Sequence, residues 1–133
     1  MVEIEIKGIG IDIIEVTRIK DLYKKFGENF TERVFTEREQ KYCLGKANPF
    51  THLALRISAK EATAKAIGWL HYAVPWLEIE YCVDGDRPEV ILTGRAKKKA
   101  IENGISKIIA SGSHSHDYAI CNAIAISFNK KEA

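Results

Sequence analysis

The chain has 133 residues, of which 46% are hydrophobic, and its 20 Lys and Arg against 18 Asp and Glu leave a formal net charge of +2. This length and apolar content predict one domain over residues 1–133 with a core of its own. The balanced charge gives no support for a nucleic-acid partner, and no stretch approaches the ~18 apolar residues of a membrane span. Three scattered cysteines and an N-terminus without a signal-peptide pattern favour a reducing, cytoplasmic location.

The first predicted element is a strand over residues 3–14. Its isoleucines alternate with other residues, first at even positions and then at odd ones: Ile4 and Ile6, followed by Ile9, Ile11 and Ile13. After the switch, Gly8, Gly10 and Asp12 share the opposite face, and the glycines leave room for a ligand to reach the backbone beside the aspartate. Burying a carboxylate there costs several kcal/mol unless a cation or hydrogen-bond donors replace the lost water. Asp12 can alternatively cap the strand end.

Two helices are predicted next, each with its own start and stop signals. The first covers residues 17–27, with Thr17 as the expected N-cap and a glycine at its end. Its outer face is basic: Arg18, Lys20, Lys24 and Lys25. The second covers residues 36–45, because Thr36 and Glu39 have the spacing of a capping box.

The longest predicted helix covers about residues 50–67, which are rich in alanine and other good helix formers. Its small apolar residues recur at helical spacing: Leu55, Ala59, Ala62 and Ala66. Glu61 and Lys65 stand four residues apart beside this stripe. Such a pair is often only a solvated ion pair worth ~0.3 kcal/mol, and spacing alone does not assign it a function.

Two strand pairs and a short basic helix complete the chain. The first pair of strands is predicted at residues 77–83 and 89–94, joined by a turn at 84–88. The basic helix is predicted at residues 95–104, and the second pair of strands at 107–113 and 117–128. The last turn carries His114 and His116. These can be plain turn residues, since zinc would need further ligands that the local spacing does not supply.

Asp12 and Glu61 are the two carboxylates that stand out against this pattern. Without a matching set of Cys and His, they favour a hard cation such as magnesium, which takes few protein carboxylates and completes its shell with water and phosphate. A magnesium site would in turn imply a substrate that carries phosphate. Lys65, Ser111 and His114 could then supply further donors to that phosphate.

Five blocks of the sequence carry a family resemblance: "GIGIDIIEVTRI", "FTERVFTEREQKYC", "LRISAKEATAKAIG", "DGDRPEVILTG" and "SGSHSHDYAICNAIA". In this order they resemble the holo-acyl-carrier-protein synthases, the small phosphopantetheinyl transferases of fatty acid biosynthesis, over residues 4–128. The resemblance implies an α+β fold: an N-terminal strand, several helices including one long central helix, then antiparallel strands. It also implies a homotrimer with active sites between neighbouring subunits.

The resemblance further implies a reaction in which the 4′-phosphopantetheine arm of coenzyme A moves to a serine of acyl carrier protein. The catalytic residues would be Asp12, Glu61 and Lys65, with Mg²⁺ bound by Asp12 and Glu61. The residues that bind coenzyme A would be Lys65, Ser111 and His114. The residues that bind the carrier protein would be Arg18, Lys25 and Arg33.

Three points stay open at the level of sequence. The serine proton could pass to Glu61 or to a water on the metal. A different class of protein is a non-catalytic α+β binding module whose basic helix docks an acidic protein or RNA. A third possibility is a phosphate-ester hydrolase that uses the same metal pair with water as the acceptor.

Overall fold

The structure is a computed structural model that describes residues 2–69, 73–83, 85 and 87–130. The elements are, in chain order, β1 (Val2–Glu15), α1 (Val16–Phe26), α2 (Glu28–Val34), α3 (Glu37–Leu44), α4 (Pro49–Ala66), the 3-10 turn η1 (Trp76–Glu78), β2 (Ile79–Cys82), β3 (Glu89–Leu92), α5 (Gly94–Glu102), β4 (Lys107–His114) and β5 (Tyr118–Lys130). This order confirms the predicted α+β class. Residues 84 and 86 of the predicted turn at 84–88 lie outside the described residues.

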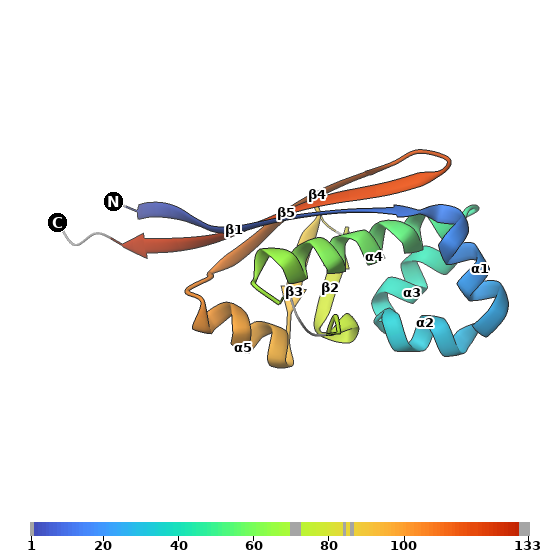
Figure 1. The fold of residues 1–133 in the computed structure, drawn as a ribbon, viewed down its shortest axis with the longest axis horizontal. Helices are drawn as coiled ribbons and strands as arrows, with labels where there is room; N and C mark the ends of the chain where they lie inside the picture. The colour runs from blue at the N-terminus through green and yellow to red at the C-terminus, as the bar shows by residue number, and fades with distance from the viewer. Residues whose placement is uncertain (1, 70–72, 84, 86, 131–133) are drawn as a thin grey trace.

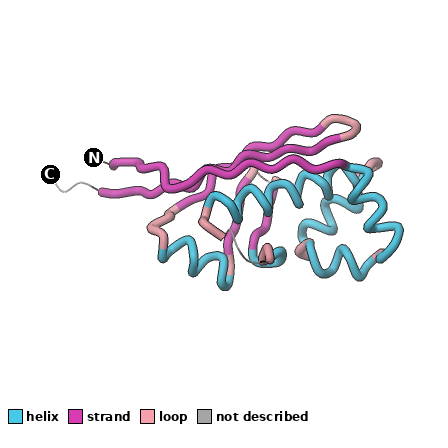
Figure 2. Tube along the Cα trace, viewed as in Figure 1, coloured by secondary structure: helices cyan, strands magenta, loops and turns pink. Residues whose placement is uncertain are grey.

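The main sheet is antiparallel, with strand order β1-β5-β4, and β2 and β3 form a separate antiparallel pair. Helix α4 runs along one face of the main sheet, while α1, α2 and α3 gather at the end away from the two termini (Figure 1). The helices lie on one side of this sheet (Figure 2). The core is therefore the space between α4 and the inner face of the sheet.

A register shift in β1 explains the change of parity in its isoleucines. The pairing with β5 is irregular between Ile6 and Gly8, as expected where a bulge inserts one extra residue. Because of this shift, the isoleucines before and after it point to the same outer face, where each is more than half exposed: Ile4, Ile6, Ile9, Ile11 and Ile13. The outer face of the sheet is thus apolar and open.

The inner face of β1 is in close contact with α4, which corrects one sequence prediction. A Cβ on Gly8 would overlap the carbonyl oxygen of Ala66, and a Cβ on Gly10 would overlap that of Ala62. The glycines therefore make room for the helix and not for a ligand. Small buried residues of β5 assist this close approach: Ala119, Cys121, Ala123 and Ala125. The stripe of small residues on α4 is likewise buried.

The helix boundaries follow the predicted signals with one exception. The capping box of α3 is confirmed, since Glu39 N–H donates to Thr36 Oγ1 at 3.2 Å and Thr36 N–H donates to Glu39 Oε1 at 2.9 Å. The prediction of Thr17 as an N-cap was wrong, because α1 already begins at Val16 and its N-cap position is Glu15. Gly27 ends α1 with a φ of 56°, a left-handed value that glycine adopts without strain.

Two short elements had no counterpart in the predictions, namely α2 and η1. The two elements contact each other. None of the helices in the described part of the chain has the length and apolar content needed to cross a membrane.

Candidate active site

Asp12 lies on β1 with its side chain toward α4, and it is partly buried. Its backbone carbonyl accepts a hydrogen bond of 2.7 Å from Ser58 Oγ, which ties this point of the strand to the helix. The Oδ2 atom is buried and has no hydrogen-bond partner among the described residues. A buried carboxylate oxygen without a donor is costly, so Oδ2 of Asp12 lacks the hydrogen-bond donor or cation that would offset its lost hydration.

Glu61 on α4 faces Asp12 across the contact between helix and strand. Burial, a side-chain hydrogen bond to Asp12 and the charge of Asp12, in this order, raise the pKa of Glu61 from 4.5 to about 7. Two facing carboxylates are both acceptors, and the pair is stable only with a proton or a cation between them. The charges of Lys65 and Arg18 act in the opposite direction and lower this pKa.

Lys65 reaches from α4 to β1. Its Nζ donates to the carbonyl oxygen of Ile11 at 2.9 Å and lies 3.7 Å from Asp12 Oδ1. The side chain is half exposed, so a negatively charged ligand beside the carboxylates can reach the ammonium. Lys65 is therefore more than the solvated partner of Glu61 that spacing alone allows, because it connects the helix with the strand that carries Asp12.

The two carboxylates open into a cleft of about 260 Å³. Arg18, Ile57 and Trp76 also line it. A neighbouring hollow of about 540 Å³ is lined by Arg18, Lys25 and Tyr118, among others. Arg18 borders both spaces, so the basic helix α1 leads directly to the carboxylates.

The third predicted docking residue is placed differently. Arg33 lies exposed in the last turn of α2 and does not line the hollow that Arg18 and Lys25 share.

The carboxylate pair fits a magnesium ion better than a transition metal. Among the residues that the structure describes, no group of three or more His, Cys, Asp or Glu is arranged to hold a metal ion. Magnesium, however, is usually held by one or two carboxylates and completes its shell with water and phosphate oxygens. The orphaned Oδ2 of Asp12 and the raised pKa of Glu61 are what such a cation would relieve.

The other two predicted ligand residues lie away from this pair in the same chain. Ser111 and His114 belong to β4, which is separated from β1 by β5. Ser111 is exposed and borders a shallow hollow with Ile11 and Asn122. The ring of His114 lies 5.7 Å from that of His52 on α4, centroid to centroid. Within one chain, the predicted site residues on β4 are therefore separate from the carboxylate pair.

A buried arginine beside His114 was missed by the sequence reasoning. Arg56 is 2% exposed, its guanidinium lies 4.5 Å from the centroid of the Tyr42 ring, and its Nε has no hydrogen-bond partner among the described residues. It donates to the carbonyl oxygen of His52 at 3.3 Å. Burial, followed by the charge of Arg56, lowers the pKa of His52. An arginine within the buried run of a helix was the available signal.

Comparisons with known proteins identify relatives of this chain. The holo-acyl-carrier-protein synthase of Chlamydia trachomatis serovar D is 42% identical over 119 residues, which is 89% of this chain and 98% of the relative. The crystal structure of the Neisseria meningitidis holo-acyl-carrier-protein synthase matches with a TM-score of 0.80 at 37% identity, covering 91% of this chain and 98% of that chain.

A Bacillus anthracis holo-acyl-carrier-protein synthase, solved in complex with CoA (3′,5′-ADP), matches with a TM-score of 0.73 at 32% identity, over 92% of this chain and 97% of that chain. The family profile described as the 4′-phosphopantetheinyl transferase superfamily matches residues 8–123, a range that contains Asp12, Glu61 and Lys65. With the fold, the facing carboxylates and these relatives in agreement, the chain belongs to the 4′-phosphopantetheinyl transferase superfamily.

Proposed function

We propose that this chain is a holo-acyl-carrier-protein synthase, which transfers the 4′-phosphopantetheine arm of coenzyme A to a serine of acyl carrier protein for fatty acid biosynthesis. The observation that carries the proposal is the pair Asp12 and Glu61, which face each other in a cleft beside Lys65 in a chain of this superfamily. The relatives at 42% identity bear the name of this activity.

In this reaction the serine oxygen attacks the phosphorus of the phosphopantetheine arm. The bond from that phosphorus to the bridging oxygen of the pyrophosphate breaks, and adenosine 3′,5′-bisphosphate leaves. The serine gives up its proton to a base. Glu61 or a water held by the metal would take this proton.

Asp12 and Glu61 would hold Mg²⁺. A bound magnesium ion supplies neutralisation of the pyrophosphate charge, which is the main requirement of phosphoryl transfer. Lys65 would also help to neutralise the pyrophosphate charge, because its ammonium is bound to the Ile11 carbonyl and its side chain remains half exposed beside Asp12. We assign to Lys65 the stabilisation of charge on the departing phosphate.

Carrier-protein docking is assigned to α1. Arg18 and Lys25 border the hollow that adjoins the carboxylate cleft, and Lys20 and Lys24 are exposed on the same helix. A basic helix at the mouth of the site suits an acidic carrier protein, because opposite charges speed and orient the encounter. Arg33, which lies outside this hollow, would act only at the edge of the contact.

The assembly is proposed to be a homotrimer in a cytoplasmic enzyme. Its support is the open outer face of the sheet, where isoleucines of β1 lie beside Ile109 of β4 and Ile120 of β5, all exposed. An apolar face of this kind marks an interaction surface. Ser111 and His114 lie away from the carboxylates of their own chain, which is consistent with a site completed by a neighbouring subunit.

Two other functions are less well supported. A non-catalytic binding module would have no use for two carboxylates that face each other at the cost of a raised pKa. A phosphate-ester hydrolase would share the metal pair, but the relatives are named holo-acyl-carrier-protein synthases and not hydrolases.

The test is a mass spectrum of apo acyl carrier protein after incubation with this chain, coenzyme A and magnesium. We expect the carrier mass to rise by one phosphopantetheine unit. Phosphate released from coenzyme A with an unchanged carrier would indicate a hydrolase. An unchanged carrier that still co-migrates with this chain would indicate a binding module.

A further inference from the structure

A buried ion pair lies directly behind the cleft, next to Glu61 in the sequence. The side chain of Lys60 is 0% exposed, and its ammonium lies 2.7 Å from Glu39 Oε1. The same ammonium donates to the carbonyl oxygen of Trp76 at 2.7 Å and to the carbonyl oxygen of Ile79. All three donors of the ammonium are therefore used, and none of them faces the substrate.

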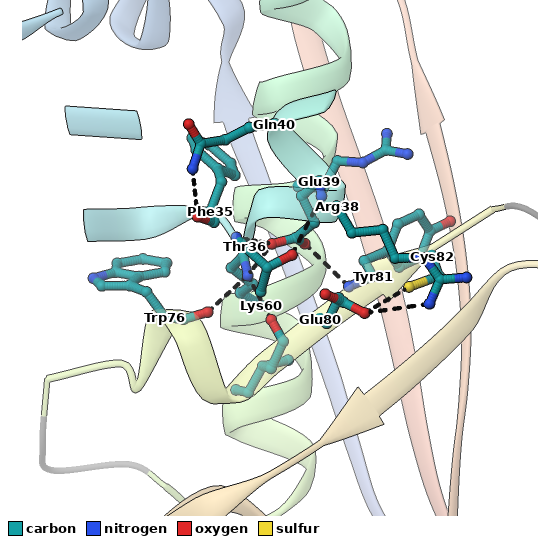
Figure 3. Close-up of polar contacts among 12 residues, drawn as sticks. Phe35, Thr36, Arg38, Glu39, Gln40, Lys60, Trp76, Glu80, Tyr81 and Cys82 are labelled. Atoms are coloured by element: carbon teal, nitrogen blue, oxygen red, sulfur yellow. Dashed lines mark hydrogen bonds and ion pairs between the residues drawn. The ribbon is translucent and has the colours of Figure 1, made fainter. Parts of the chain in front are cut away.

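Glu39 is equally well satisfied. Its Oε2 accepts a hydrogen bond of 3.0 Å from Tyr81 N–H, and its Oε1 accepts one from Thr36 N–H in addition to the contact with Lys60. Figure 3 shows these contacts converging from α3, α4, η1 and β2 on one point. The Lys60–Glu39 pair is thus a fully buried charged junction of these four elements, whereas the Arg38–Glu80 pair that also joins α3 to β2 is partly exposed.

A gain in stability alone does not explain a buried ion pair at this position. Burying two charges costs several kcal/mol per ion, and well-packed apolar residues of similar volume often stabilise a protein as well or better. Burial, as its largest cause, lowers the pKa of Lys60, while the charge of Glu39 opposes this shift. What an apolar pair could not do is hold the two carbonyl groups of Trp76 and Ile79 at fixed positions.

Trp76 connects this junction with the active site. Its backbone carbonyl is bound by Lys60, and the residue lines the cleft that contains Asp12 and Glu61. Lys60 and Glu61 are neighbours on the same helix, so the position of one cleft wall is set relative to the metal-binding carboxylate by a single side chain. Loss of the ammonium would release η1 from α4 and allow Trp76 to move. It would not change the chemical identity of any side chain that lines the cleft.

We propose that Lys60 and Glu39 are positioning residues that hold Trp76 against the cleft and so set the affinity of the site for coenzyme A. The inference rests on the proposed function for its kinetic meaning only. Neither residue touches the substrate, and both act through the backbone of η1. A merely structural ion pair would contribute to the melting temperature but leave the affinity for coenzyme A unchanged.

The test uses the double variant Glu39→Leu/Lys60→Met. Each single variant leaves one buried charge without a partner and can fail to fold, whereas the double variant removes both charges and keeps the volume. A Trp69→Phe background makes Trp76 the one remaining tryptophan, since the chain has two. The matched control is Thr36→Ala, which removes the α3 cap and lowers stability but leaves Lys60 bound to Trp76.

Three quantities are measured in all variants: quenching of Trp76 fluorescence by acrylamide, binding of coenzyme A by calorimetry, and the KM values for coenzyme A and carrier protein. We expect the double variant to fold, to show stronger quenching, and to bind coenzyme A about tenfold more weakly, with the KM for carrier protein little changed. Thr36→Ala should lower Tm alone. A folded double variant with the quenching and coenzyme A affinity of the parent would overturn the proposal. If the parent itself fails to modify carrier protein, the proposed function fails, while the quenching measurements still decide whether the ion pair positions Trp76.

Discussion

The two faces of β1 differ in packing and in polarity. On the inner face, glycines and Asp12 lie against α4 so closely that a Cβ on Gly10 would overlap the helix backbone. On the outer face, Ile9, Ile11 and Ile13 are 68%, 54% and 61% exposed. The inner face is closely packed and holds a carboxylate oxygen without a hydrogen-bond partner among the described residues, whereas the outer face is apolar and exposed.

This difference shows how one strand can serve two purposes. Successive side chains point to opposite faces, so one parity can hold a carboxylate for chemistry while the other provides apolar surface for association. The bulge after Ile6 keeps the isoleucines before and after it, from Ile4 to Ile13, on the outer face despite the change of parity in the sequence. If the two faces have separate roles, changes to one should leave the other intact, and the following predictions test this separation.

The largest effect is expected on the inner face. Asp12→Asn and Glu61→Gln should each lower kcat/KM at least about a hundredfold, or ~3 kcal/mol, because each would remove a charged ligand of the proposed magnesium ion. Since both carboxylates act through one ion, the double variant should lose much less than the sum of the single losses. Steady-state kinetics with varied magnesium measure this effect.

The matched control for this prediction is Glu5→Gln, which changes an exposed carboxylate on the same strand that pairs with Lys7 and does not line the cleft. It should keep full activity. An Asp12→Asn protein that melts at a lower temperature, yet retains its specific activity and its dependence on magnesium, would show that Asp12 is structural and would refute the metal site.

The second largest effect is expected on the outer face. Ile11→Lys introduces a charge into the apolar surface, and burial of an unpaired charge costs several kcal/mol. We expect sedimentation at micromolar concentration to shift from trimer to monomer, with activity at low protein concentration falling more than tenfold. Ile101→Lys is the control, because Ile101 is an equally exposed isoleucine on α5. A monomeric Ile11→Lys protein with full activity would show that the active site does not need a neighbouring subunit.

A smaller effect is expected at the edge where β1 leads into α1. Arg18→Glu and Lys25→Glu should raise the KM for carrier protein about tenfold, and added salt should reduce the difference from the parent protein. The matched control is Lys97→Glu/Lys98→Glu, which reverses two exposed charges on the basic helix α5. Equal increases in the KM values for carrier protein and coenzyme A would contradict docking through α1.

Local signals were sufficient to predict most of the fold. The α3 capping box and the alanine-rich run of α4 were identified because their signals lie within a few residues of each other. Helix α2 was missed, since its seven residues are stabilised by contacts with distant elements rather than by a strong local pattern. The N-cap at Thr17 was wrong because β1 passes into α1 without a loop.

The candidate site was predictable only in part, because its geometry depends on distant residues. Spacing alone could not bring Asp12 near Glu61; the sequence only singled them out as two carboxylates suited to a hard cation, the family resemblance implied the same pair, and the structure has them face each other. The glycines before Asp12 were assigned to a ligand, whereas the backbone of α4 occupies that space. The ion pair of Lys60 and Glu39 had no local signal, since its two residues lie on different helices.

The smallest expected effect is on how the free energy of unfolding of the metal-free protein depends on pH. Variants on the inner and outer faces of β1 should differ in this dependence. The pKa of Glu61 is raised from 4.5 to about 7 in the folded state. Below about pH 4.5 the carboxyl is protonated in both states, and between 4.5 and 7 the folded protein keeps a proton that the unfolded chain has released. Stability is therefore lost as the pH rises through this window, and the loss is complete above about pH 7. After allowance for solvent screening of a half-buried group, the loss is about 1–2 kcal/mol.

Urea unfolding at several pH values between 5 and 8 measures this loss as the difference between the parent protein and Glu61→Gln. The variant should lack the Glu61 contribution and be the more stable of the two at pH 8 without metal. Magnesium at pH 8 should stabilise the parent but not the variant, because the cation replaces the proton between the carboxylates. The outer-face variant Ile11→Lys should keep the pH dependence of the parent, since its change lies on the opposite side of β1. Identical pH dependence in the parent and Glu61→Gln would mean that the pKa of Glu61 is not raised in the folded protein. The two carboxylates would then not require a cation between them.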